Sequence, residues 1–356
     1  MLTSLGSSPV NGFVATVFED MEARVGRTHL SKRLALQVDH SARYFGNGFG
    51  GFHWENIDLF PRILDFFLRT CGVIDRGRRN TLDYEIVDHL MVLPNLPEAF
   101  HDLTMLQLSD IHVDGIPDGG ERLMAAIQAL TFDVCVMTGD YRFQTYGNYD
   151  PSLRGMEKLA EAITCPFGMV GILGNHDFVE MVPLLESYGI KMLLNEALSI
   201  EKGGSTLHIL GLDDAHFYGV HDLGKALRDL PAGDTKILLA HSPELLAEAA
   251  HAGVDCYLCG HTHGGQICLP GGIPILTNAQ CPRRYASGQW RYEKTQGYTS
   301  RGTGSSGLAV RFYCRPEITL HRLIRPKVSD SLGGRSEDLP EAVSSENRQG
   351  AHPGRN

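Results

Sequence analysis

Two histidines, His261 and His263, stand two positions apart in the glycine-rich sequence CGHTHGGQ, directly after an apolar run. Imidazole side chains at this spacing are suited to metal binding or proton transfer. Three kinds of site are compatible with the segment taken alone. The first is a zinc site that Cys256 and Cys259 complete. The second is a glycine loop that binds phosphate. The third is a larger site whose other residues lie elsewhere in the chain.

The first two kinds of site find little support in the sequence. A zinc half-site needs a second pair of ligands, and the chain has no other C-x-x-C pair. Cys256 and Cys259 lie three positions apart, so in a strand they point to opposite faces and do not reach one ion. The segment itself contains neither G-x-G-x-x-G nor G-K-[ST]. We therefore interpret both cysteines as core residues.

Four further polar clusters follow the ends of apolar stretches. In α/β sheets, loops from separate strands converge at the carboxyl edge, so we expect these clusters to meet. Each cluster alone is also compatible with a turn, a helix cap or a core histidine, but five successive occurrences favour a metal centre. Carboxylate, amide and imidazole ligands of this mix suit divalent ions of manganese, iron, zinc or cobalt. The candidate metal ligands are Asp110, His112, Asp140, Asn175, His241, His261 and His263.

This series of motifs resembles the calcineurin-like metallophosphoesterases, whose motifs run D-x-H, G-D, G-N-H-D/E, H and G-H-x-H. The chain carries DIH at 110–112, GD at 139–140, GNHD at 174–177, His241 and GHTH at 260–263. It looks most similar to a bacterial branch whose last motif reads GHTHGGQ. The resemblance implies an α/β fold, a four-layer α/β/β/α sandwich of two mixed sheets.

The resemblance also implies roles for individual residues. One metal ion takes Asp110, His112, Asp140 and His263, and the second takes Asp140, Asn175, His241 and His261, so that Asp140 bridges them. A hydroxide that bridges the two ions then attacks phosphorus, and the ions stabilise the charge that develops on the phosphoryl oxygens.

Three further residues are candidates for catalysis or substrate binding. His176 is not a metal ligand in the family and is expected to protonate the leaving group, with Asp177 orienting its imidazole. The alternative for Asp177 is a carboxylate that accepts hydrogen bonds from amides at a helix start. Arg142 is a candidate to hold a substrate phosphate, with a surface ion pair as the alternative. Arg283, Arg284 and Arg301 are weaker candidates of the same kind.

The expected substrate is a phosphate ester, with a phosphodiester or pyrophosphate bond as the first choice. The family members that this chain resembles include enzymes that act on lipid-linked compounds such as UDP-diacylglucosamine. A phosphomonoesterase or a protein phosphatase is the alternative among enzymes. From another class, a non-catalytic interaction scaffold on the same fold remains open, although such a scaffold does not need a complete set of ligands.

Short apolar runs alternate with helical patterns between residues 83 and 325, as expected for α/β architecture. From Gln289 to Leu323 the pattern is one of strands and turns. The predicted strands are Tyr84–Val92, Leu103–Leu108, Val134–Met137, Met169–Leu173, Leu207–Leu212, Ile237–Ala240 and Cys256–Cys259. The predicted helices are Gly120–Leu130, Leu153–Ile163, Val179–Ser187 and Glu244–Ala250.

Three regions are expected along the chain: a mostly helical N-terminal extension (1–82), a metallophosphoesterase domain (83–325) and a disordered tail (326–356). The tail is rich in serine, glycine and charged residues and has few large apolar ones. In the extension, apolar residues recur at helical spacing between Phe60 and Cys71. That stripe either packs on the main domain or lies on a membrane surface, with nearby arginines assisting.

The composition narrows the class of protein further. A net charge of −10 over 356 residues argues against a general nucleic-acid partner. The eight cysteines are too few for a disulfide scaffold in a chain of this length and are expected as reduced, mostly buried thiols. The first residues lack a basic region and have only a short apolar stretch, so no signal peptide is expected, and no uninterrupted apolar run of about 18 residues occurs in the sequence. We therefore expect a cytoplasmic protein with possible peripheral membrane contact, while its oligomeric state is left open.

Overall fold

The computed structural model describes residues 18–45 and 59–326. The chain divides into two units, Met1–Arg325 and Pro326–Asn356. The predicted disordered tail, apart from its first residue, lies outside the described residues. The account below concerns the first unit.

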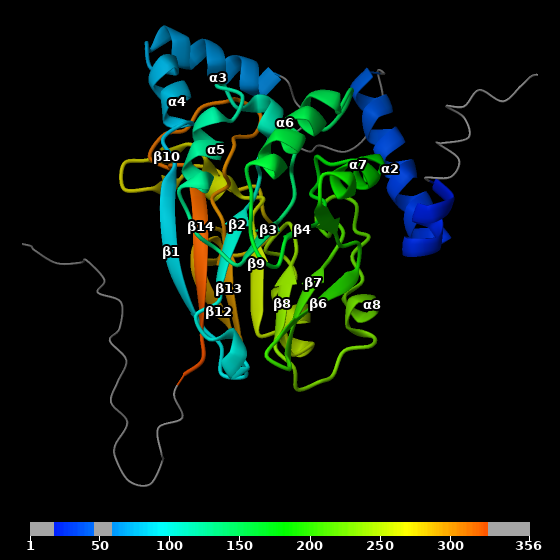
Figure 1. Ribbon diagram of the computed structural model, residues 1–356. Coiled ribbons are helices and arrows are strands. Elements are labelled where there is room, and N and C mark those ends of the chain that lie inside the picture. The colour runs from blue at the N-terminus through cyan, green and yellow to red at the C-terminus, as the bar shows by residue number, and fades with distance from the viewer. Residues whose placement is uncertain (1–17, 46–58, 327–356) are drawn as a thin grey trace, which may run out of the picture. The chain divides into compact units, whose positions relative to one another are not determined.

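One six-stranded sheet is built around the strands that precede the first three polar clusters (Figure 1). Its order is β1-β14-β2-β3-β4-β5; β14 runs antiparallel to β2, and the other neighbours are parallel. The strands are β1 (Glu85–Val92), β2 (Thr104–Leu108), β3 (Val134–Met137), β4 (Met169–Gly171), β5 (Ile190–Met192) and β14 (Glu317–Ile324).

A second six-stranded sheet carries the last two polar clusters. Its order is β12-β13-β9-β8-β7-β6, with antiparallel pairs at both edges and parallel pairs between them. The strands are β6 (Glu196–Lys202), β7 (Ser205–Gly211), β8 (Lys236–Leu239), β9 (Cys256–Cys259), β12 (Gly288–Tyr292) and β13 (Thr295–Thr299).

The two sheets pack face to face, and helices cover their outer faces. Buried side chains of both sheets, such as Val136 and Ile237, form the central core. On the outer face of the first sheet lie α5 (Glu121–Gln128), α6 (Asp150–Glu161) and α7 (Val182–Ser187), and on that of the second lie α8 (Leu223–Leu227) and α9 (Leu246–His251). The predicted four-layer α/β/β/α sandwich of two mixed sheets is thereby confirmed.

Side chains along β9 alternate between the two faces of the sheet, and this places its two cysteines in different cores. Cys256 belongs to the core between the sheets, whereas Cys259 belongs to the outer core beneath α8 and α9. Both side chains are fully buried. The two thiols therefore face opposite sides of one sheet, as predicted, and they do not form a zinc half-site.

Helices also make up the described part of the N-terminal region: residues 18–25, α2 (Arg27–Phe45), α3 (Leu59–Thr70) and α4 (Ile74–Asn80). The apolar stripe predicted on α3 is split between two environments. Leu68 packs with Ile74 of α4 on Val310, whereas Phe66 and Phe67 are exposed to solvent. Among the described residues, no helix combines the length and apolar character needed to cross a membrane.

Candidate metal centre

The seven candidate metal ligands converge at the carboxyl ends of five strands. Asp110 and His112 follow β2, Asp140 follows β3 and Asn175 follows β4, all in the first sheet. In the second sheet, His241 follows β8, and His261 and His263 follow β9. All seven residues are buried. The structure therefore brings together the complete set that the sequence predicted.

Two groups of ligand atoms can be distinguished in the cluster. In the first, His263 Nε2 lies 3.4 Å from Asp110 Oδ1 and 3.3 Å from His112 Nε2. In the second, His241 Nε2 lies 3.0 Å from Asn175 Oδ1 and 3.2 Å from His261 Nδ1.

Asp140 lies between the two groups. Its Oδ2 atom is 3.8 Å from His112 Nε2 and 3.3 Å from His241 Nε2. One carboxylate is thus within reach of imidazoles from both groups.

The hydrogen bonds on the far side of two imidazoles fit metal binding. His112 Nδ1 lies 2.7 Å from the carbonyl oxygen of Arg142, and His241 Nδ1 lies 2.8 Å from that of Thr138. A carbonyl oxygen only accepts, so each ring carries a proton on Nδ1 and turns Nε2 into the cluster. Metal-bound histidines are typically oriented in this way. Together with the carboxylate and amide oxygens, this donor set fits divalent metal ions.

Nearby histidines keep the carboxyl of Asp140 ionised inside the buried cluster. Burial opposes ionisation of Asp140, but His176, His241 and His112 hold the pKa of its carboxyl well below the usual range. Burial likewise opposes protonation of His241, yet Asp140 and Asp110 raise its pKa well above the usual value. Burial raises the pKa of Asp110. Asp140 therefore keeps its negative charge in the buried cluster, as a cation site requires.

The backbone turns sharply at these ligands. Five of the seven, Asp110, His112, Asp140, His261 and His263, have positive φ angles between 44° and 71°. Such angles are uncommon in residues other than glycine, and they cluster at functional sites. Thr262, between the last two, is helical (φ −77°, ψ −15°), so the chain does turn between His261 and His263, as two separate ligand positions require.

A glycine at the start of the last motif is required by the close approach of two loops. A Cβ atom on Gly260 would lie 1.9 Å from Ser109 Oγ and 2.2 Å from Asp110 Oδ2. The amide of His261 then donates to the Asp110 carboxylate at 3.0 Å. Gly260 thus allows the loop after β9 to contact the loop after β2.

The structure places His176 beside the cluster but corrects the role expected for Asp177. His176 Nε2 lies 3.7 Å from Asp140 Oδ2, while its Nδ1 lies 2.8 Å from the carbonyl oxygen of Phe143. Phe143, and not Asp177, therefore orients this imidazole. Asp177 instead accepts hydrogen bonds from backbone amides of three residues, Gly174, Asp140 and Tyr141, at 2.7–2.9 Å. Burial and Asp140 raise the pKa of Asp177 to about 6.

Arg142 is buried and bonded to its own loop. Its Nη2 donates to the carbonyl oxygens of Tyr146 and Gly147, and its guanidinium lies 4.2 Å from the centre of the Phe178 ring. The alternative of a surface ion pair is wrong, because the side chain is not at the surface. A contact between Arg142 and substrate stays a prediction.

Several residues that support the site were not predicted. Buried Arg311 lies with Nη2 3.4 Å from His263 Nδ1, and it also donates to the carbonyl of Gly304. Buried Arg33 of α2 donates to the carbonyl oxygen of Asp177 at 2.8 Å. Nothing in the local sequence marks these two arginines, because their burial depends on segments distant in the chain.

Comparisons with known proteins match this chain to one family. Residues 103–265 match the family model described as calcineurin-like phosphoesterase. The uncharacterized metallophosphoesterase YkuE of Bacillus subtilis is 30% identical over 250 residues, which cover 67% of this chain and 85% of that protein. YkoQ, another uncharacterized metallophosphoesterase of Bacillus subtilis, is 28% identical over 260 residues (70% of this chain and 93% of that protein). The phosphodiesterase YaeI of Escherichia coli is 29% identical over 203 residues (54% and 70%).

The two-sheet fold, the buried cluster of ligands and these sequence matches lead to one assignment. The chain belongs to the calcineurin-like metallophosphoesterases, hydrolases that act on phosphate esters with the help of divalent metal ions.

Proposed function

We propose that this enzyme hydrolyses a phosphodiester or pyrophosphate bond with two divalent ions bound in the cluster. One ion is held by Asp110, His112, Asp140 and His263, and the other by Asp140, Asn175, His241 and His261. The position of Asp140 carries the proposal, because its Oδ2 lies 3.8 Å from His112 Nε2 in one group and 3.3 Å from His241 Nε2 in the other. When bound, such a pair of ions supplies a hydroxide nucleophile near neutral pH and neutralises charge on the phosphoryl oxygens.

The chain's own residues supply the proton for the leaving group. The carbonyl of Phe143 accepts the Nδ1 proton of His176, so Nε2 is the atom available to the reaction. A protonated His176 donates from Nε2 to the departing oxygen. The Asp140 carboxylate, 3.7 Å from that nitrogen, stabilises the imidazolium. Asp177 contributes by fixing three backbone amides around the ligand loops.

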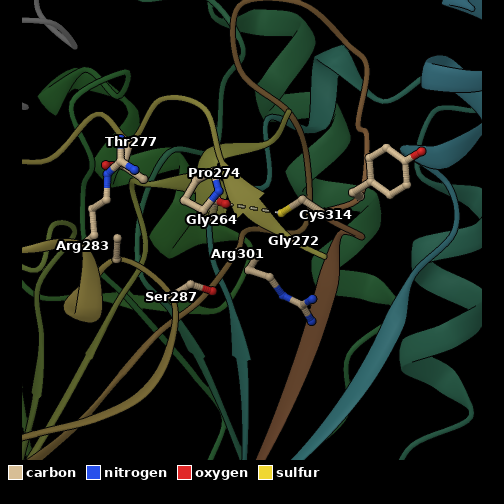
Figure 2. A pocket seen from close by; sticks show the side chains of 10 residues that line it. Gly264, Gly272, Pro274, Thr277, Arg283, Ser287, Arg301 and Cys314 are labelled. Atoms are coloured by element: carbon tan, nitrogen blue, oxygen red, sulfur yellow. Dashed lines mark hydrogen bonds between the residues drawn. The ribbon is translucent and has the colours of Figure 1, made fainter. Parts of the chain in front are cut away.

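A cavity beside the cluster offers space for a group attached to the substrate phosphate. It has a volume of about 230 Å³ and begins at Gly264, the neighbour of His263. Figure 2 shows Arg283, Ser287 and Arg301 around it. Arg301 is already paired with Glu317 and Glu85, so Arg283 is the better candidate of the two for contacting an anionic group.

The substrate that we propose is lipid-linked, of the kind of UDP-diacylglucosamine, and it is reached at a membrane surface on the cytoplasmic side. Two exposed apolar segments support peripheral contact. One is the face of α3 formed by Ile63, Phe66 and Phe67, and the other is the hairpin of β10 (Cys268–Leu269) and β11 (Ile273–Pro274) with the residues that follow it. We call these two segments the apolar rim.

The two segments of the rim are connected through one small hydrophobic cluster, and the hairpin borders the cavity. Leu68 of α3 packs in one cluster with Ile267 and Phe312, and Ile267 directly precedes the hairpin. Pro274 of the hairpin and Tyr313 both line the cavity. Between residues 62 and 79 there are five arginines and two aspartates, in a chain whose net charge is −10. A basic and apolar rim of this kind favours an anionic lipid surface.

Metal analysis combined with a substrate panel tests the proposed activity. We expect two divalent ions per chain and faster hydrolysis of bis-p-nitrophenyl phosphate than of p-nitrophenyl phosphate in the presence of Mn²⁺. UDP-diacylglucosamine should be hydrolysed at its pyrophosphate. The Asp140→Asn variant, which loses the shared carboxylate charge, is the control and should lose both ions and turnover.

The panel separates the proposal from its alternatives. Preference for monoesters or phosphopeptides would replace it with a phosphomonoesterase or protein phosphatase. A protein that binds no metal and hydrolyses none of the substrates would be the non-catalytic scaffold.

A further inference from the structure

The loop that carries two of the site residues is held from two sides. Residues 174–177 follow β4 and include Asn175 and His176. On one side, the amides of Gly174 and His176 donate to the carboxylates of Asp177 and Asp140 at 2.8 and 2.9 Å. On the other side, the carbonyl oxygens of the loop face α2, a helix that lies outside the matched family region of residues 103–265.

Arg33 of α2 is the residue that meets these carbonyls. Its Nη2 donates to the carbonyl oxygen of Asp177 at 2.8 Å and to that of Gly174 at 3.4 Å. The two acceptors flank Asn175 and His176 in the sequence, so a single guanidinium spans the segment that carries both side chains.

The guanidinium is completely buried and has two further partners. It forms an ion pair with Asp213 (Nη1–Oδ1, 3.1 Å) and lies 3.5 Å from the centre of the Tyr218 ring. A buried charge with such partners has a fixed geometry, because any displacement would leave it uncompensated.

Residues one turn before and one turn after Arg33 continue the same contact. Gln37 accepts a hydrogen bond from the amide of Val179 at 3.0 Å and donates to Glu180 at 2.8 Å. His29 Nε2 lies 2.7 Å from Asp213 Oδ2. Positions 29, 33 and 37 share one face of a helix, so α2 presents a polar stripe to the catalytic loop and its surroundings.

We propose that Arg33 is a positioning residue, which acts through the loop and holds Asn175 and His176 in register with Asp140 and His241. Asn175 Oδ1 lies 3.0 Å from His241 Nε2, and His176 Nε2 lies 3.7 Å from Asp140 Oδ2. A displacement of about 1 Å at reacting groups costs about 10²-fold in rate, so the support of this loop is a matter of catalysis as well as stability.

Arg33→Met tests the proposal, with Arg24→Met as its matched control. Arg24 also ties the N-terminal helices to the main body, through Glu186 (3.0 Å) and Glu196 (2.7 Å), but it does not contact the loop. Both variants lose an arginine that anchors the same region. Only the first loses the contact with the carbonyls of Gly174 and Asp177.

The first measurement is amide hydrogen exchange of the full-length protein, followed by mass spectrometry of peptides that cover residues 174–179. In Arg33→Met we expect exchange in this segment to be at least about 10-fold faster, because its carbonyls lose their partner. The second measurement is turnover of bis-p-nitrophenyl phosphate. We expect kcat to fall about 10²-fold with KM nearly unchanged, since the loop positions reacting groups and does not bind the substituents.

Two conservative variants keep the test informative if Arg33→Met folds poorly. Arg33→Lys retains a charge beside Asp213 but lacks the planar fork, so intermediate values of both quantities are expected. Gln37→Ala removes the acceptor for the Val179 amide and the donor to Glu180 but leaves Arg33 in place, so it should raise exchange at Val179 with a smaller loss of kcat.

The proposal is overturned if Arg33→Met exchanges and turns over like the wild type. It is equally overturned if Arg24→Met raises exchange in 174–179 and lowers kcat by the same factors, because a general loosening of the N-terminal helices would then explain both. Failure of the proposed function can be distinguished from failure of the proposal for Arg33. In that case even the wild type does not hydrolyse the diester, while the exchange comparison still gives its answer.

Discussion

Asp140 is the residue that joins most parts of the site. Its Oδ2 atom lies within 3.3–3.8 Å of Nε2 of His112, His176 and His241, and its Oδ1 accepts a hydrogen bond from the amide of His176 at 2.9 Å. One side chain after β3 therefore contacts the loops after β2, β4 and β8. His176 differs from the other imidazoles near it, because in the proposed mechanism it acts on the leaving group and binds no metal ion.

Replacement of His176 separates metal binding from proton transfer. The His176→Ala variant should keep its full content of metal ions, since the proposed ligand set does not include this residue. Its kcat should fall by about 10²–10⁴-fold, the usual contribution of a general acid. The loss should be larger for alkyl esters than for p-nitrophenyl esters, because p-nitrophenolate departs without a proton. Metal content by mass spectrometry and kcat for both ester types are the measurements.

Asp140→Asn provides the contrast for this variant, because its loss of activity should come together with loss of metal. Unchanged kcat for alkyl esters in His176→Ala, with the metal ions in place, would contradict the assignment. Loss of the metal ions in His176→Ala would also contradict it, since His176 would then be needed for metal binding.

At the scale of elements, the strands next to the site were predictable because they are short, mostly apolar and followed by polar residues. Val134–Met137 and Cys256–Cys259 begin and end where expected. β5 (Ile190–Met192) was missed because it is a short edge strand with a lysine at its centre, and β6 (Glu196–Lys202) because it is an edge strand of mixed polarity. The strands whose ends place the ligands are therefore easier to predict from the sequence than the strands at the sheet edges.

The partners of individual side chains were less predictable than the elements. Asp177 was expected to orient His176, but the loop conformation presents three backbone amides to its carboxylate. Arg33 gave no signal, because an arginine in a helical pattern normally faces solvent and its burial here depends on Asp213 and Tyr218. Such contacts depend on tertiary packing, which local patterns in one sequence do not encode.

The two elements of the apolar rim lead to a prediction about membrane binding. In flotation with vesicles that contain phosphatidylglycerol, we expect the wild type to bind and the Phe66→Ser/Phe67→Ser variant to bind at least about 10-fold less, because two exposed aromatic rings lose their apolar surface. Ile275→Ser/Leu276→Ser should have a similar effect at the hairpin. Binding should weaken in high salt and on neutral vesicles, since the arginines near α3 contribute electrostatically.

Val38→Ser is the matched control for these variants. Val38 is an apolar residue with 67% of its surface exposed, comparable to Phe66 at 72%, but it lies on α2 outside the rim. Its replacement should leave flotation unchanged. Equal flotation of all variants would remove the membrane from the proposal. A change of oligomeric state in the rim variants, with unchanged flotation, would assign the rim to an interface between copies of the chain.

At the scale of the whole molecule, a series of hydrogen bonds that all point in the same direction connects side chains of the first sheet to the backbone of the second. Gln107 donates from Nε2 to the carbonyl of Cys259 at 3.0 Å, which turns its Oε1 toward His321 Nε2 at 2.9 Å. His321 therefore carries its proton on Nε2. Its Nδ1 then accepts from His89 Nδ1 at 2.9 Å. Both imidazoles are neutral in this arrangement, and both pack against the ring of Tyr298.

Neutral buried histidines make the stability of the fold depend on pH. Burial lowers the pKa of His321 well below its usual value, with a further contribution from His89, and burial lowers that of His89 despite Gln289 and the charge of Glu317. In the unfolded chain a histidine titrates near pH 6.5. Above that pH both states are neutral and the full stability is present. As the pH falls below it, the unfolded state takes up the proton first, so stability is lost.

Replacement of His321 by glutamine should therefore flatten the dependence of stability on pH. Glutamine still donates to Gln107 and accepts from His89, but it does not titrate. Between pH 7.5 and 5.5 the wild type should lose about 1.4 kcal/mol more free energy of unfolding than His321→Gln, the contribution of one histidine that stays neutral in the folded state. Urea unfolding followed by circular dichroism at both pH values measures this difference. Histidines of the metal centre contribute equally to both proteins and cancel in the comparison. Equal losses in the two proteins would mean that His321 is protonated as readily in the fold as in the unfolded chain, and the neutral network between the sheets would be wrong.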